Sequence, residues 1–126
     1  MATESEIVAF INAYKECALW STLDESDECG GEPLDRNYSV EDMSSETIEC
    51  TERDCREFIE RNEELLDVVG DYSQHGHDFW LTRNWHGAGF WDRGYGEIGK
   101  LLSTSCDLYY PEVHLYVGDD GKIYVS

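Results

Sequence analysis

Residues 45–69 carry the strongest periodic pattern in this chain of 126 residues. At 100° per residue, nine apolar or small side chains fall within one arc of about 120°, namely Ile48, Thr51, Cys55, Phe58, Ile59, Asn62, Leu65, Leu66 and Val69. The opposite arc carries acidic side chains with three arginines between them. Ser44 or Ser45 can cap the start of a helix, and Gly70 can end it. The pattern predicts an amphipathic helix over 45–69 that buries one face.

The charge of the chain is strongly negative and unevenly distributed. There are 28 acidic and 9 basic residues, a net charge of -19. Residues 1–72 hold 21 acids and five bases (net -16), whereas residues 73–126 hold seven acids and four bases (net -3). This charge disfavours direct binding to nucleic acid or to an anionic membrane. With 40% apolar residues and the length of one typical domain, we nevertheless expect a folded single domain over 1–126.

The acidic part of the chain predicts a second helix and a loop. Thr3 and Glu6 form a capping-box pattern before apolar residues at helical spacing, which predicts a helix over 4–20. Residues 21–38 contain six acids, two glycines and a proline without a sustained period, so we expect a solvated acidic loop.

The aromatic-rich part, residues 73–126, predicts mainly β-hairpins. It holds ten of the aromatic residues, against six in residues 1–72. The apolar runs at 79–82 and 90–91 favour strands joined by a long connection. Residues 95–105 favour a short helix, and the runs at 112–117 and 122–125 flank a Gly-Asp-Asp-Gly turn. The expected fold is therefore α+β, with two main helices and a short one packed on a small antiparallel sheet built from two hairpins.

Two further features bear on the cellular compartment. The five cysteines are odd in number and contain no CxxC pair, so we expect free, mostly buried thiols in a reducing environment. The chain has no run of 18 apolar residues, and its start lacks the pattern of a secretory signal. We expect no membrane association.

The second half also contains two long strings, HDFWLTRN at 77–84 and HGAGFWDRG at 86–94. They resemble a segment shared by small uncharacterised proteins encoded by bacteriophages and related mobile elements. The run LYVGDDGKIY at 115–124 is similar to the C-terminus of that family, and 54–62 resembles its preceding helix. The resemblance, over roughly 54–126, implies a phage origin and a location in the host cytoplasm, and it implies no activity. A function particular to this chain is then expected in its acidic N-terminal region.

The acidic helix face suggests nucleic-acid mimicry. Carboxylates every three or four residues are spaced by about 4.5 to 6 Å, close to the roughly 3.4 Å between phosphates of a DNA strand. We therefore expect a non-enzymatic inhibitor, without cofactor or metal, that binds a basic nucleic-acid-binding host protein, such as a restriction or CRISPR defence component. The expected partner-binding residues are Asp24, Glu25, Asp27, Glu28, Glu46, Glu49, Glu57, Glu60, Glu63, Glu64 and Asp67, together with Trp85.

A plain solvated helix is the simpler alternative for this face. Three i,i+4 pairs in the favoured order can neutralise part of it, namely Glu49 with Arg53, Glu52 with Arg56 and Glu57 with Arg61. Five acids remain without an obvious local partner, namely Asp54, Glu60, Glu63, Glu64 and Asp67.

Two other functions remain open. His77, His86 and Asp92 could serve a small hydrolase or a nucleic-acid-modifying enzyme, because a carboxylate can orient a histidine as a general base. Alternatively, Asn84, His86 and Asp92 could hold the connection of the expected hairpin through side-chain bonds to its backbone, with His75 and His77 in a link before its first strand. An assembly or adaptor protein could dock through Trp85.

Overall fold

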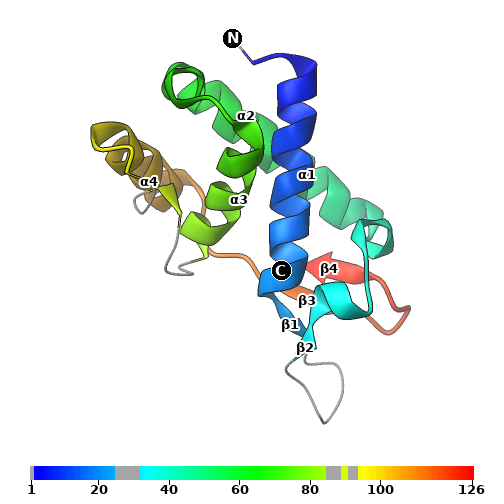
Figure 1. Ribbon diagram of the computed structural model, residues 1–126. Coiled ribbons are helices and arrows are strands. Elements are labelled where there is room, and N and C mark those ends of the chain that lie inside the picture. The colour runs from blue at the N-terminus through cyan, green and yellow to red at the C-terminus, as the bar shows by residue number, and fades with distance from the viewer. Residues whose placement is uncertain (1, 25–31, 85–88, 91–93) are drawn as a thin grey trace.

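Four α-helices form the body of the computed structural model, which describes residues 2–24, 32–84, 89–90 and 94–126 (Figure 1). The helices are α1 (Glu4–Ser21), α2 (Ser45–Val69), α3 (Tyr72–Arg83) and α4 (Glu97–Tyr109). Two short 3₁₀-helices, η1 (Leu34–Arg36) and η2 (Val40–Asp42), precede α2. Strands β1 (Leu23–Asp24) and β2 (Glu32–Pro33) pair antiparallel, as do β3 (Leu115–Val117) and β4 (Ile123–Val125). Together these elements form one small α+β domain.

The two main helices follow their sequence patterns closely. Thr3 and Glu6 form the reciprocal capping box at the start of α1. The Ser44 hydroxyl accepts the Thr47 N–H at the start of α2, and Gly70 ends the helix with a φ of 73°. The predictions for 4–20 and 45–69 are therefore confirmed.

Helix α2 is kinked at Asn62, whose φ of -121° and ψ of 17° are not helical. The Asn62 amide donates to the Phe58 carbonyl and to the Ser105 hydroxyl on α4, at 3.0 Å each. Helices commonly kink where a side chain takes part in the i to i−4 hydrogen-bond pattern of the backbone, as the Asn62 amide does here.

The prediction of a hairpin with strands at 79–82 and 90–91 is wrong, because residues 72–83 form helix α3. The helix starts at Asp71, whose carboxylate accepts the Gln74 N–H. Residues 78–83 are all buried, so this second half of the helix is enclosed by its neighbours. A run of apolar residues in a helix that is buried all round has no polar stripe, and it therefore resembles a buried strand.

Helices α1 and α3 lie side by side and run in the same direction (Figure 1). A Cβ atom at Gly76 would overlap the carbonyl oxygen of Phe10, so glycine permits this close approach. Further along, the Trp80 indole N–H donates to the Ser21 hydroxyl at 2.6 Å. The pair forms the centre of the domain.

The C-terminal hairpin is confirmed, with Leu115 opposite Val125 and Tyr116 opposite Tyr124. It is attached to the start of α2, because the Ile123 carbonyl accepts the Ser44 N–H at 2.9 Å and the Thr47 hydroxyl at 3.0 Å. The expected single sheet of two hairpins is not formed. The described residues contain two separate two-stranded sheets, and the first lies where an acidic loop was expected.

Aromatic side chains fill the core between the helices. Phe58 of α2 stacks on Phe79 of α3 with ring centroids 4.2 Å apart. Phe10 packs against both rings, and Phe90 stacks on Phe58. The aromatic-rich part of the chain thus supplies helix packing instead of a sheet. Among the described helices, none has the length and apolar character needed to span a membrane.

The cysteines that the structure describes form no disulfide with one another. Three are buried and one is half-buried, namely Cys17, Cys55, Cys106 and Cys50 respectively.

Candidate functional site: the acidic face of α2

Helix α2 contains nine acidic and three basic residues, a net charge of -6. We define the α2 acidic face as its eight outward acidic residues, Glu46, Glu49, Glu52, Glu57, Glu60, Glu63, Glu64 and Asp67. Glu63 is half-buried and the others are exposed. The opposite side of the helix packs into the core through Cys55, Phe58 and Leu66, which are fully buried. The sequence pattern therefore places these carboxylates on one side of the helix, facing solvent.

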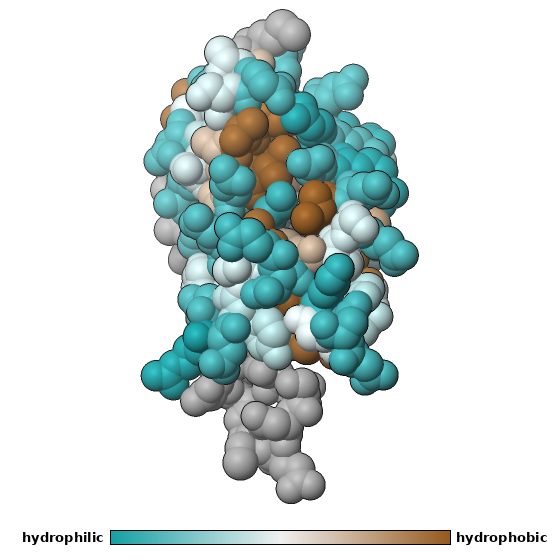
Figure 2. Space-filling model, turned by 90° about the vertical axis from the view of Figure 1, so that its right-hand side faces the viewer, coloured by the Kyte–Doolittle hydropathy of each residue, from teal (hydrophilic) through white to brown (hydrophobic). Residues whose placement is uncertain are grey.

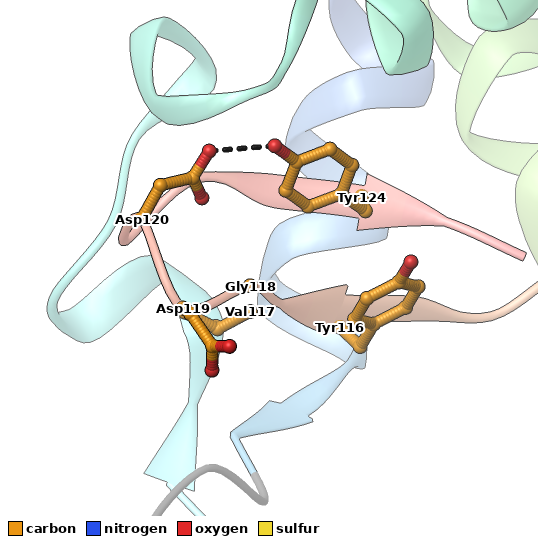
Figure 3. Close-up of a pocket in the computed structure, with 6 residues that line it drawn as sticks. All are labelled: Tyr116, Val117, Gly118, Asp119, Asp120 and Tyr124. Atoms are coloured by element: carbon orange, nitrogen blue, oxygen red, sulfur yellow. Dashed lines mark hydrogen bonds between the residues drawn. The ribbon is translucent and has the colours of Figure 1, made fainter.

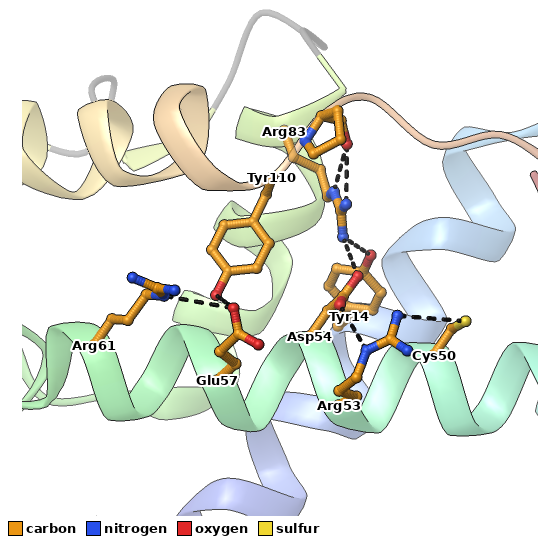
Figure 4. Close-up of polar contacts among 9 residues, drawn as sticks. Tyr14, Cys50, Arg53, Asp54, Glu57, Arg61, Arg83 and Tyr110 are labelled. Atoms are coloured by element: carbon orange, nitrogen blue, oxygen red, sulfur yellow. Dashed lines mark hydrogen bonds and ion pairs between the residues drawn. The ribbon is translucent and has the colours of Figure 1, made fainter.

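The arginines of α2 neutralise less of this face than their spacing suggests. Arg61 pairs with Glu57 (Nε to Oε1, 3.4 Å), as expected. Arg56 instead reaches α1, where its guanidinium binds Glu4 at 2.8 and 3.3 Å. The Arg53 guanidinium contacts Asp54 at 3.5 Å and the Cys50 sulfur at 3.7 Å (Figure 4). The expected pairs of Arg53 and Arg56 with Glu49 and Glu52 are therefore replaced by other contacts.

Two members of the face have structural partners. Glu57 accepts the Tyr110 hydroxyl at 3.2 Å in addition to Arg61, and Asp67 accepts the Tyr72 hydroxyl at 2.5 Å. The carboxylates of the other six make no hydrogen bond or ion pair with another described residue, namely Glu46, Glu49, Glu52, Glu60, Glu63 and Glu64. These six make the open part of the α2 acidic face.

The other expected partner-binding residues are not brought to this face by the described structure. Asp24 belongs to β1, and its backbone pairs with Glu32. Glu25, Asp27, Glu28 and Trp85 lie outside the described residues.

Asp54, which has no arginine at helical spacing, is paired through the tertiary fold. The buried Arg83 of α3 donates to the Asp54 carboxylate at 3.0 Å and to the Tyr14 hydroxyl at 3.1 Å (Figure 4). It also donates twice to the Pro111 carbonyl, at 3.1 and 2.9 Å. We call these four residues the Arg83 cluster. Because it joins α1, α2, α3 and the segment before β3, it holds α2 in place and exposes its acidic face.

The Arg83 cluster has the chemistry of a structural site. Burial raises the pKa of the Tyr14 phenol, outweighing the opposing charge of Arg83, so Tyr14 stays a neutral acceptor for the guanidinium. Sequence reasoning missed this cluster, because its members are 28 or more positions apart in the chain. An arginine inside an apolar run, Phe79-Trp80-Leu81-Thr82-Arg83, was the available signal that a buried partner exists.

Of the three residues expected to serve an enzyme, the structure describes His77. His75 and His77 lie inside α3, not in a link, and residues two apart on a helix do not face each other. His75 is fully buried near the rings of Tyr72 and Phe90, and burial lowers its pKa. His77 is half-buried with its ring 5.9 Å from the ring of Trp20.

The remainder of that cluster, His86 and Asp92, lies outside the described residues. Within the described part of the chain, no group of three or more His, Cys, Asp or Glu side chains is placed to hold a metal ion. The buried carboxylate of Asp78 accepts the Gln74 amide at 3.1 Å. Because His86 and Asp92 are not described, the hydrolase hypothesis stays a prediction.

No protein-family model matches the chain, and no curated protein or solved structure matches it either. The resemblance to phage-encoded proteins, and the origin and location that it implies, stay predictions. The candidate site is therefore defined by geometry and charge.

Proposed function

We propose that this protein binds a basic, nucleic-acid-binding protein through the α2 acidic face and thereby blocks access to nucleic acid. The observation that carries the proposal is the set of six carboxylates without a partner among the described residues, from Glu46 to Glu64. They extend over 18 helical steps, or roughly 27 Å. A partner whose cationic groove accepts a phosphate backbone would meet a row of negative charges of comparable density.

Electrostatics favours such a complex over the isolated protein. Unpaired carboxylates on one helix repel each other and reduce the stability of the compact state. A cationic partner removes that repulsion, and the displaced counterions add to the gain as they do when a protein binds DNA. Complementary charge also raises the association rate, so the expected binding is fast and sensitive to salt.

The surface near α1 and α2 also supports a protein partner. Figure 2 views the molecule from the right-hand side of Figure 1. It shows a group of apolar side chains in the upper part of the view, surrounded by hydrophilic residues. Protein interfaces commonly combine an apolar centre with a polar rim. Apolar area next to the charged helix would add a salt-resistant contribution that nucleic acid itself does not supply.

The class of partner rests on the resemblance to phage-encoded proteins. If the chain acts in an infected bacterium, the basic proteins that a phage gains most from blocking are those that attack its nucleic acid. We therefore propose a restriction or CRISPR component in the host cytoplasm as the partner, and a non-enzymatic mode of action.

The test is capture from a bacterial lysate with the tagged protein at low and high salt. The test variant carries Glu46→Gln, Glu60→Gln, Glu63→Gln and Glu64→Gln. The matched control removes four exposed acids elsewhere on the surface, Glu16→Gln, Glu97→Gln, Asp107→Asn and Glu112→Gln. Both variants lose four negative charges, so they separate the effect of this face from that of net charge.

We expect the native protein and the control variant to capture the same nucleic-acid-binding protein at low salt. The test variant should lose it, and high salt should weaken capture strongly. The purified protein should also displace DNA or RNA from the captured partner in a gel-shift assay. Equal losses in the two variants, or capture that resists salt, would refute mimicry by α2.

A further inference from the structure

The outer surface of the C-terminal hairpin carries a second feature, which we call the tyrosine cleft (Figure 3). It is an open hollow of about 480 Å³ lined by Tyr116, Val117, Gly118, Asp119, Asp120 and Tyr124. Tyr116 and Tyr124 are direct cross-strand partners, so their side chains share one face of the hairpin. Their rings stack with centroids 5.7 Å apart and an interplanar angle of 23°. The inward face is formed by Leu115 and Ile123, which are buried.

Two features of the turn fix the shape of the cleft. A Cβ atom at Gly118 would lie 2.6 Å from the Tyr124 ring, so glycine leaves room for that ring beside the turn. The Tyr124 hydroxyl donates to the Asp120 carboxylate at 2.6 Å, and the Lys122 N–H donates to the same carboxylate at 3.0 Å. The ring and the carboxylate are thus held in one arrangement before any ligand arrives.

The cleft is electrically negative. The hydrogen bond from Tyr124 lowers the pKa of Asp120, which therefore stays ionised. Asp119 is exposed beside it and has no hydrogen bond or ion pair with the part of the chain that the structure describes. The hydrogen bond to Asp120 raises the pKa of Tyr124, and the charge of Glu46 on α2 adds to the effect. The Lys122 ammonium is a nearby positive charge, and it offsets the negative charge of Asp120 only in part.

An aromatic face beside a carboxylate is a site for an organic cation. Tyrosine rings attract cations placed over them, and a planar guanidinium can stack on the ring while it donates to a carboxylate. This chain already contains one such arrangement. The Arg61 guanidinium lies 4.1 Å from the centroid of the Tyr109 ring and pairs with Glu57. In the tyrosine cleft the same two groups are present, and no described arginine or lysine is stacked on either ring.

We propose that the tyrosine cleft binds an arginine side chain of a basic peptide segment. The source of that segment rests on the proposed function, because a nucleic-acid-binding partner presents arginines on its surface. Glu46 belongs to the α2 acidic face and lies near Tyr124, so one partner can contact both. The cleft would then supply a defined pocket for one side chain next to a surface that acts through charge.

The test uses the peptide acetyl-Gly-Arg-Gly-amide as the probe in an NMR titration of the full-length protein. Acetyl-Gly-citrulline-Gly-amide is the control ligand, because it has nearly the same shape without the charge. We expect the arginine peptide to shift the amide signals of Gly118, Asp119 and Gly121 in a saturable manner, with millimolar affinity. The citrulline peptide should bind at least tenfold more weakly. A lysine peptide that binds as well as arginine would overturn the assignment to a guanidinium.

Two variants locate the binding. Tyr116→Leu removes an exposed ring and keeps an apolar side chain, and Asp120→Asn removes the carboxylate charge; each should weaken arginine binding at least fivefold. The control variants are Tyr109→Leu and Glu97→Gln, which change a half-exposed tyrosine and an exposed acid elsewhere and should have no effect. Shifts confined to α2, or unchanged affinity in Tyr116→Leu, would show general attraction to negative charge and overturn the proposal.

The outcome is separable from that of the proposed function. If Tyr116→Leu still captures the lysate partner with native affinity, the cleft plays no part in the complex, while mimicry by α2 stands. If the peptide binds the cleft but no basic partner is captured, the arginine site stands and the proposed function fails.

Discussion

Replacement of Arg83 by methionine should destabilise the protein more than any surface charge change. The substitution keeps most of the side-chain stem but removes a guanidinium that is 3% exposed and makes four hydrogen bonds. It leaves the Asp54 carboxylate, 21% exposed, without its buried partner. Removing one partner of a buried ion pair lowers the unfolding free energy by about 3 to 5 kcal/mol, because the other charge is left without compensation. For a domain of this length, that loss lowers the melting temperature by roughly 10 to 20 °C.

The assay is urea and thermal unfolding followed by circular dichroism, with Arg61→Met as the control. Arg61 also pairs with a glutamate, but on the surface, where such a pair contributes about 1 kcal/mol or less. If Arg83→Met fails to fold, Arg83→Lys provides a measurable second variant, because lysine keeps the charge but cannot donate to three acceptors at once in a fork. Equal losses for Arg83→Met and Arg61→Met would refute the assignment of a structural role to the Arg83 cluster.

Three further predictions concern the core. Gly76→Ala should lower the unfolding free energy by more than about 2 kcal/mol, because the added methyl group meets the α1 backbone, whereas Ser73→Ala on the exposed side of α3 should be nearly neutral in the same urea titration. Burial lowers the pKa of His75, so the unfolded chain takes up a proton below about pH 6.5 that the folded chain resists. Stability should therefore fall between pH 7.5 and 5.5 by up to about 1.4 kcal/mol more than in His75→Phe, and parallel pH profiles would contradict this. Iodoacetamide should label Cys50 in the native protein but leave Cys106 unlabelled until urea unfolds the chain, because burial raises the pKa of the Cys106 thiol; peptide mass spectrometry would detect early labelling of Cys106 as a failure.

The sequence predicts α2 well because several independent signals agree there. Ser44 provides a cap, Gly70 provides an end, and the apolar arc between them lies against a core while the acidic arc faces solvent. Local preference and tertiary packing therefore favour the same structure. The C-terminal hairpin is predicted for a similar reason, since Asp120-Gly121 supplies a turn and Gly121 adopts a φ of 78°.

The sequence misleads at α3 because burial removes the periodic pattern. Phe79, Trp80 and Thr82 have strand preferences, and only their packing against α1, α2 and α4 reveals a helix. A local signal was nevertheless present. Asp71 followed three residues later by Gln74 is a cap pattern, and the structure uses Asp71 as the cap.

The candidate site shows the same division between local and tertiary information. The outward direction of Glu46, Glu60 and Glu64 follows from helical spacing alone. The pairing of Arg56 with Glu4, 52 positions away, depends on how α1 crosses α2, which no spacing within one helix encodes. The stacked tyrosines of the cleft required the strand register, which fixes Tyr116 opposite Tyr124.

The way in which Arg83 reaches position 111 has an evolutionary consequence. It binds a main-chain carbonyl there, and every amino acid supplies that group. Position 111 is therefore free to drift among homologous chains, while Tyr14 and Asp54 take part through their side chains and should change only together with Arg83. A homologue with an aliphatic residue at 83 should also have lost the acid at 54, and an aligned set of such sequences would show this as covariation between two positions 29 apart.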